Sequence, residues 1–248
     1  MNNIYIYDGG FISFIALVVE LFKRKIVPDD IKLIDSFDKG LFDNEIFIKV
    51  EDERRNIELL KTKLTKEVSY CIYNVFLSDN KNKEMIIYNF LINYFKYGKT
   101  IFGRRNIDSV NESIKITKYV RGEAHKLKGF LRFSKMKNNF YYAKFESTNN
   151  VIGILANHFS KRLMSDNFII HDTKRGIYAI YDKKKILYLT SNDIVDLKLE
   201  KDNEDSIEDL WKTFYKTIGI KERENKRCRQ NFMPKKYWKN MLEMEDEV

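Results

Sequence analysis

Three histidines and one aspartate are the side chains in this 248-residue chain whose types and order favour acid–base or metal chemistry. They are His125, His158, His171 and Asp172. Imidazole and carboxylate groups transfer protons in catalysis and bind metal ions. If the elements that carry them pack together, these four side chains form a candidate catalytic or metal centre. The alternative is that the histidines have separate structural roles, for example His125 stabilising the carboxyl end of a helix.

No standard signature assigns this centre a metal or a cofactor. The sequence contains no Walker-type phosphate loop, no dinucleotide-binding glycine fingerprint, no GxSxG segment and no HExxH segment. Cys71 and Cys228 lie too far apart in the sequence to form a metal-spaced pair. The metal and the cofactor are therefore unknown from the sequence, and the question of catalysis stays open.

Positive charge is concentrated near the carboxyl end. The chain has a net charge of +9, and residues 212–239 contain ten basic and two acidic residues, an excess of eight. The aromatic residues interleaved with this charge are Trp211, Phe214, Tyr215, Phe232, Tyr237 and Trp238. Basic side chains bind phosphates and aromatic rings stack on bases, so the mixture indicates a nucleic-acid partner. The alternative is a terminal helical segment whose rings pack on the core while its lysines are solvated.

Hydrophobic periodicity predicts a mainly helical first half. A short strand is expected over 4–7, ending at the glycine turn Gly9-Gly10, and a second strand over 47–50. Helices are expected over 11–25, 51–64, 65–77, 83–97 and 109–127. On the last of these, Lys118, Arg121, His125 and Lys128 recur at steps of three and four and form a basic stripe. Its simpler interpretation is an ordinary solvated helix face.

The second half alternates apolar and polar residues with a period of two. Strands are expected over 129–136, 140–146, 168–171, 176–181 and 185–189, with a helix over 150–163. Residues 191–205 are expected to be a loop, followed by helices over 207–218 and 235–242.

These elements predict an α+β fold. We expect a helical amino-terminal half, a central antiparallel sheet of about five strands with one inserted helix, and a basic helical carboxyl-terminal segment. A single domain over 1–248 is favoured, and the alternative is a subdivision into 1–105 and 106–248.

Membrane insertion and export are not expected. No apolar run approaches the roughly 20 residues of a membrane span, and the run over 11–22 contains Glu20. The amino terminus lacks the pattern of a signal peptide. We therefore expect a cytoplasmic protein with no membrane partner.

Several segments, taken in order, resemble a bacterial family known as probable DNA metabolism proteins. They are Tyr7–Phe11, Glu123–Phe133, Asn157–Phe159 with Arg162, Ile169–Asp172, Leu210-Trp211, Glu222–Asn225 and Met233–Trp238. The GFLRF and MPxxYW segments are the most specific. The chain departs from the family at Lys226, where proline is common, and at Gly10, where serine is common.

The resemblance implies a DNA-linked role. Members of that family are typically encoded beside a radical-SAM protein assigned to DNA repair, and some are fused to a uracil-DNA glycosylase-like domain. The family supplies no established catalytic residues, so the matching positions are candidates only. With the charge pattern, the candidate nucleic-acid-binding residues are Arg121, Lys128, Arg132, Arg162, Arg223, Asn225, Arg229, Lys235, Lys236, Tyr237 and Trp238.

Three functions follow from these patterns. The first is a DNA-binding accessory factor in a repair or modification pathway that works with a radical-SAM partner. The second is an enzyme acting on DNA through the His/Asp group, with or without a metal. The third is a protein-interaction module whose aromatic carboxyl-terminal segment binds a partner without nucleic-acid contact.

Overall fold

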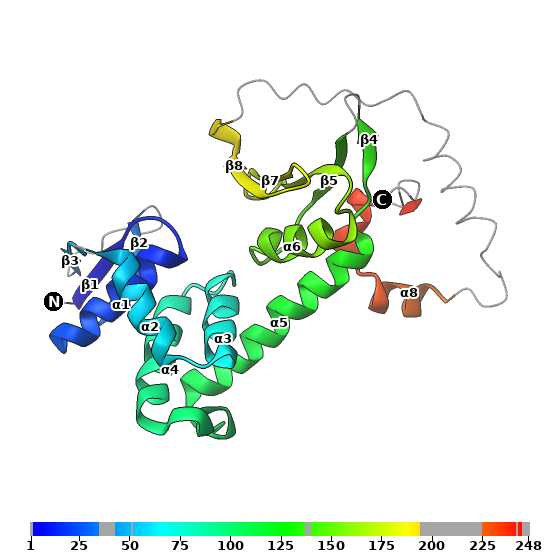
Figure 1. Ribbon diagram of the computed structural model, residues 1–248. Helices are drawn as coiled ribbons and strands as arrows, with labels where there is room; N and C mark the ends of the chain where they lie inside the picture. The colour runs from blue at the N-terminus through cyan, green and yellow to red at the C-terminus, as the bar shows by residue number, and fades with distance from the viewer. Residues whose placement is uncertain are drawn as a thin grey trace. The chain divides into compact units, whose positions relative to one another are not determined.

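The computed structural model describes residues 2–34, 43–50, 52–136, 140–193, 225–241 and 243–244 (Figure 1). The chain forms two compact units, Met1–Arg121 and Gly122–Val248. Helix α5 (Asp108–Phe130) contains the boundary between them. The division therefore falls inside a continuous helix, whereas the sequence placed its alternative boundary at 105/106. The single-domain organisation stays a prediction.

The first unit combines a small parallel sheet with a group of helices. Its elements are β1 (Asn2–Tyr7), α1 (Phe11–Arg24), β2 (Asp30–Leu33), β3 (Asp43–Phe47), α2 (Glu53–Lys63), α3 (Lys66–Phe76), α4 (Lys83–Tyr97), η2 (Gly98–Gly103) and the start of α5. The strand order is β2-β1-β3, with β1 parallel to both neighbours. Parallel neighbours require a crossover, and α1 supplies the one from β1 to β2. The turn between β1 and α1 needs glycine, because Gly9 has a φ of +89°.

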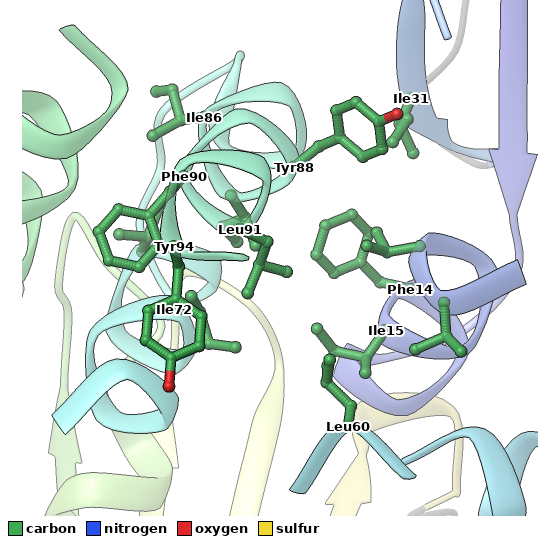
Figure 2. Packing of buried hydrophobic residues seen from close by; sticks show 14 of the residues in the cluster. Phe14, Ile15, Ile31, Leu60, Ile72, Ile86, Tyr88, Phe90, Leu91 and Tyr94 are labelled. Atoms are coloured by element: carbon green, nitrogen blue, oxygen red, sulfur yellow. The ribbon is translucent and has the colours of Figure 1, made fainter. Parts of the chain in front are cut away.

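Apolar side chains from α1, α2, α3 and α4 meet in one core. Figure 2 shows Phe14 and Ile15 of α1 beside Leu60 of α2, with Ile72 of α3 and Phe90 of α4 in the same core. Phe14 and Phe90 are fully buried. The five helices expected in the first half of the chain are present, with ends that differ by at most three residues. Sequence analysis missed β2, whose four residues alternate charged and apolar side chains, and it placed β3 several residues too late.

The second unit is built on a five-stranded sheet. After α5 come β4 (Ser134–Met136), β5 (Phe140–Phe145), α6 (Ile152–Arg162), β6 (Asn167–Asp172), β7 (Ile177–Tyr181), β8 (Ile186–Thr190), η3 (Ser191–Asp193), α8 (Lys226–Phe232) and η5 (Lys235–Asn240). The strands follow the order β4-β5-β6-β7-β8. The α+β class, the five strands and the inserted helix are confirmed.

The sheet is mixed rather than antiparallel, which corrects the sequence-based expectation at one pair of strands. β5 and β6 run parallel, and the other three pairs are antiparallel. The reason is α6, which lies between β5 and β6 in the chain and acts as a crossover connection. α6 packs against β6, β7 and β8. Its Phe159 contacts Phe133, which in turn contacts Phe168 of β6.

The carboxyl-terminal segment differs from its expected form. The expected helix over 207–218 and most of the expected loop over 191–205 lie outside the described residues. The expected helix over 235–242 is the 3-10 helix η5, and α8 was not expected because it is only seven residues long. No helix in the described part of the chain has both the length and the apolar character needed to cross a membrane.

The contact between α6 and the sheet predicts a large effect of one core substitution. Phe168→Ala removes a fully buried ring that packs on Phe133 and Tyr181, and should lower the free energy of unfolding by about 3–5 kcal/mol. The control is Phe232→Ala, since this ring is 76% exposed and its loss should change stability by less than about 0.5 kcal/mol. Urea denaturation followed by circular dichroism measures both. Equal effects would contradict this packing.

Candidate nucleic-acid interface

The terminal segment, described over residues 225–241 and 243–244, is held in the second unit by buried side chains. Tyr237, Trp238, Met241 and Met244 are each at most 4% exposed. The Tyr237 ring packs against Phe130 of α5, with 5.4 Å between ring centroids. This arrangement corresponds to the anchoring alternative of the sequence analysis.

The Trp238 side chain is held by a hydrogen bond at its indole N–H and by cations near its ring. Its indole N–H donates to the carbonyl of Met233 at 2.9 Å. The cationic groups of Arg229 and Lys235 lie 5.4 and 5.7 Å from its ring centroid. The roles of Tyr237 and Trp238 as nucleic-acid contacts stay predictions. Both rings are buried, whereas Arg227 and Lys235 of the same segment are exposed.

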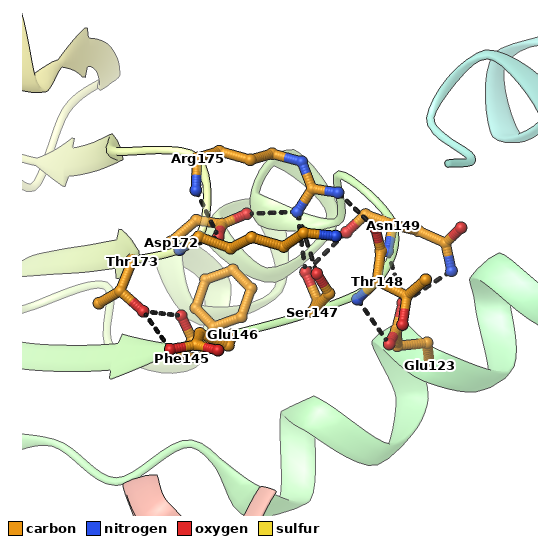
Figure 3. Close-up of polar contacts among 10 residues, drawn as sticks. Glu123, Phe145, Glu146, Ser147, Thr148, Asn149, Asp172, Thr173 and Arg175 are labelled. Atoms are coloured by element: carbon orange, nitrogen blue, oxygen red, sulfur yellow. Dashed lines mark hydrogen bonds and ion pairs between the residues drawn. The ribbon is translucent and has the colours of Figure 1, made fainter. Parts of the chain in front are cut away.

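A buried carboxylate fastens this segment to the rest of the unit. Glu123 of α5 is 4% exposed. It accepts hydrogen bonds from the backbone N–H groups of Thr148 and Asn149, at 3.0 and 2.8 Å, and from the Asn149 side chain at 2.7 Å (Figure 3). From the terminal segment, the Lys236 ammonium lies 3.0 Å away and the Tyr237 hydroxyl donates at 3.3 Å. One carboxylate thus joins α5, the loop before α6, and η5.

The donors around Glu123 keep it ionised. Burial by itself would raise the pKa of Glu123, but the N–H groups of Asn149 and Thr148 and the Lys236 ammonium outweigh it, and the pKa lies below its ordinary value. Burial works in the opposite sense on Lys236, yet its contacts with Tyr237 and Glu123 raise the pKa of the ammonium. The pair is charged at neutral pH.

Two further ion pairs tie the terminal segment down. The Arg132 guanidinium contacts Glu243 at 2.5 and 3.3 Å, and it also donates to the carbonyl of Gly129 at 2.7 Å. Lys239 contacts Glu146 at 2.5 Å. Arg132, a candidate phosphate ligand from the sequence, therefore has a structural partner in a carboxylate that is itself 2% exposed.

Asp172 organises the turn after β6. It is fully buried and accepts hydrogen bonds from the backbone N–H groups of Lys174 and Arg175 and from the Arg175 guanidinium at 3.0 Å. Arg175 also donates to the carbonyls of Ser147 and Thr148 (Figure 3). Asp172 therefore supports, through Arg175, the same loop that Glu123 holds from the other side.

His171 lies on the opposite face of the sheet from Asp172, because successive residues of a strand alternate between faces. Its Nδ1 is 2.8 Å from the Tyr142 hydroxyl, and its ring is stacked on Tyr178 with 3.9 Å between centroids. Burial lowers the pKa of His171, and nearby Lys144 lowers it further against the opposing effect of Asp172. The structure thus does not join His171 and Asp172 in one site.

His158 is brought together with two of the candidate cations. It lies on α6 four residues before Arg162, on the same helix face. Partial burial lowers the pKa of His158, and the positive charges of Lys128 and Arg162 lower it further. Lys128 comes from α5, where His125 is also exposed. Within the described residues, no three His, Cys, Asp or Glu side chains are grouped to hold a metal ion.

The remaining candidates are distributed over both units. Arg121 is in the first unit, where its guanidinium lies over the Tyr70 ring. The Asn225 side chain accepts a hydrogen bond from the N–H of Cys228 at 2.9 Å and so caps α8. Lys235 is exposed. Arg223 lies outside the described residues.

Sequence reasoning missed the central role of Glu123. Glu123 entered the sequence analysis only as the first residue of the family-like segment Glu123–Phe133. A usable signal was present: Val120, Glu123, Ala124 and Leu127 follow the spacing of a buried helix stripe, and Glu123 is the charged member of it. A carboxylate at such a position requires buried partners.

The described terminal segment is mainly basic, and its acidic residue Glu243 is paired with Arg132. Residues 225–239 contain six basic residues and no acidic residue. Lys236 and Lys239 are paired with carboxylates, whereas Arg227 and Lys235 are exposed. Anchored at η5, the segment presents cations from a fixed backbone.

Comparison with known proteins gives a family match. A family model for a domain of unknown function, DUF4130, matches residues 81–243. This range includes Glu123 and the anchors Tyr237, Trp238 and Met241 of the terminal segment. No curated protein matches the chain.

The Glu123 network predicts a specific loss of stability. Glu123→Gln removes the charge and places an amide N–H₂ group against existing N–H donors, so it should lower the free energy of unfolding by about 2–3 kcal/mol. Glu112→Gln is the matched control, since Glu112 is an exposed residue of the same helix. Urea denaturation compares them. A loss no larger than that of the control would refute the central role of Glu123.

The lowered pKa of Glu123 predicts that wild type and Glu123→Gln differ in how their stability depends on acidic pH. The pKa of Glu123 is lower in the folded protein than its ordinary value of 4.5, so its ionised form contributes stability above that pH and loses this contribution as the pH falls through the folded-state pKa. The stability difference between wild type and Glu123→Gln should therefore shrink below about pH 4.5. Denaturation curves at several pH values give this difference, and a constant difference would contradict the assignment.

Proposed function

This chain belongs to the DUF4130 family, and we propose that it is a nucleic-acid-binding accessory factor in a DNA repair or modification pathway. The observation that carries the proposal is the anchored terminal segment, in which residues 225–239 contain six basic residues and no acidic residue. The radical-SAM partner is part of the proposal through the resemblance of the sequence motifs to the DNA metabolism family.

Binding would depend on contacts with phosphate groups. Arg227 and Lys235 are exposed, and Lys235 is next to Lys236, whose charge is already compensated by Glu123. Cations that neutralise phosphates release condensed counterions, and this gives sequence-independent affinity. Because the anchor is buried, the cations need little further ordering when the polyanion binds.

A second group of cations supports the same function. Lys128 and Arg162 are close enough to His158 to lower its pKa. A phosphate placed among these three groups would reduce their mutual repulsion and favour protonation of His158. This group belongs to the second unit, as does the terminal segment.

The two other functions have less support among the described residues. The enzyme alternative requires the histidines and Asp172 to converge, but His171 and Asp172 project from opposite faces of β6. The interaction-module alternative relies on an accessible aromatic segment, and Tyr237 and Trp238 are each 4% exposed.

The test is DNA binding measured by fluorescence anisotropy over a salt series. Wild type should bind, with log K falling linearly as log salt concentration rises. Arg227→Ala/Lys235→Ala should weaken binding and reduce the slope for duplex DNA by about 1.8, because each phosphate contact contributes about 0.9.

The control removes the same charge from the first unit. Lys49→Ala/Lys61→Ala changes two exposed lysines and should leave the slope within about 0.5 of wild type. The proposal fails if wild type does not bind at low salt. It also fails if both double variants reduce the slope equally, since binding would then depend on net charge alone.

A further inference from the structure

An apolar groove lies in the first unit between α3, η2 and α5. Its volume is about 530 Å³, within the range of small-ligand sites. The lining residues are Glu67, Tyr70 and Cys71 of α3, Phe102 of η2, and Ile114, Thr117, Lys118 and Arg121 of α5. Cys71 is buried, whereas Glu67, Tyr70 and Lys118 are exposed and form the rim.

The floor of the groove offers apolar surface rather than hydrogen-bonding groups. The Thr117 hydroxyl donates to the Cys71 carbonyl at 3.4 Å and is also 3.4 Å from its sulfur. Burial raises the pKa of the Cys71 thiol, so it stays neutral. The polar atoms of these two residues therefore contact each other. The floor can therefore make van der Waals contact with a flat or apolar group of a ligand, but it offers few hydrogen bonds to the ligand's polar atoms.

The rim combines an aromatic ring with cations. Tyr70 is 46% exposed, and the Arg121 guanidinium lies 5.2 Å from its ring centroid. Lys118 is three residues before Arg121 and so lies on the same side of α5. Lys66, one helical turn before Tyr70 on α3, is also exposed. Among the lining residues, the cations Lys118 and Arg121 outnumber the one acid, Glu67, so the mouth has a net positive charge.

We propose that this groove receives an unpaired base of single-stranded nucleic acid. Tyr70 and the Arg121 guanidinium stack on the base, and Lys118 contacts its phosphate. Rings and guanidinium planes are the groups that commonly bind exposed bases, and a base inside a duplex is already stacked on its neighbours. The inference rests on the proposed function and deepens it by naming single strands as the preferred ligand. Because the floor does not recognise base edges, binding is tolerant of sequence.

The experiment compares two tyrosine variants with fluorescein-labelled oligo(dT) and with duplex DNA. Tyr70→Leu keeps the apolar surface but removes the ring, and should weaken oligo(dT) binding by about 5- to 150-fold, as expected for loss of one base–aromatic stack. Duplex affinity should change by less than about twofold. Tyr119→Leu is the control, since Tyr119 is 55% exposed on α5 but does not line the groove.

A second variant and a cross-link keep the test independent of Tyr70 alone. Arg121→Lys retains the charge but removes the planar group, and should weaken oligo(dT) binding more than duplex binding. An oligonucleotide containing 5-iodouracil should form a photo-cross-link at Tyr70 of the wild-type protein.

The outcomes separate the two proposals. If wild type binds DNA with the expected salt dependence but Tyr70→Leu binds oligo(dT) as well as Tyr119→Leu does, the groove proposal is overturned and the proposed function stands. The groove proposal is also overturned, and the proposed function stands, if the photo-cross-link forms only at residues outside the groove. If Arg227→Ala/Lys235→Ala leaves binding unchanged while the Tyr70 cross-link persists, the terminal segment is refuted as the interface and the groove is retained.

Discussion

A carboxylate removed from water must be surrounded by donors, and the second unit is organised around this requirement at Glu123. The backbone N–H groups of Thr148 and Asn149 satisfy one side of the carboxylate, and Lys236 and Tyr237 satisfy the other. These donors come from segments far apart in the chain. Hydrogen bonds to a buried charge are stronger than those between neutral groups, so they hold the segments that carry these donors firmly in place.

The position of the terminal cations follows from this network. Once Lys236 and Tyr237 are fixed, the rest of η5 and the preceding α8 can present their basic residues only around that anchor. The loop that completes the network is itself supported by Asp172 through Arg175. Asp172, a candidate catalytic residue from the sequence, therefore supports the anchor of the terminal segment through the backbone that Arg175 contacts.

Sequence reasoning was most successful where a pattern extended over many residues. The apolar repeats of α1, α4 and α5 predicted those helices, and alternation predicted the strands of the second unit. The direction of β6 relative to β5 was wrong, since a strand pattern does not encode direction and only the crossover by α6 determines it. The candidate site was predicted as residue types rather than as contacts, and the proximity of Lys128 and Arg162 to His158 was not among the predictions.

The remaining misses have a common physical origin. His171 and Asp172 were grouped on the expectation that the elements carrying them pack together, yet the two are neighbours on one strand and the pleat directs them to opposite faces. Glu123 was overlooked because its partners at 148–149 and 236–237 are distant in sequence. The cap that the Asn225 side chain forms on α8 was not predicted, and its role in nucleic-acid binding stays a prediction. Such long-range satisfaction of polar groups is not visible in local patterns.

The Glu123 network joins residues that are synthesised at different times, since its partners lie at 148–149 and at 236–237. α5 and the 147–149 loop are synthesised well before Lys236 and Tyr237, so in the nascent chain Glu123 lacks its cationic partner until residues 236–237 have been added. Over the same period Leu127, Phe130 and Leu131 lack the ring that packs beside them. A transcript truncated shortly before η5 would thus yield a product with an uncompensated charge next to bare apolar surface, the kind of defect that chaperones and proteases detect.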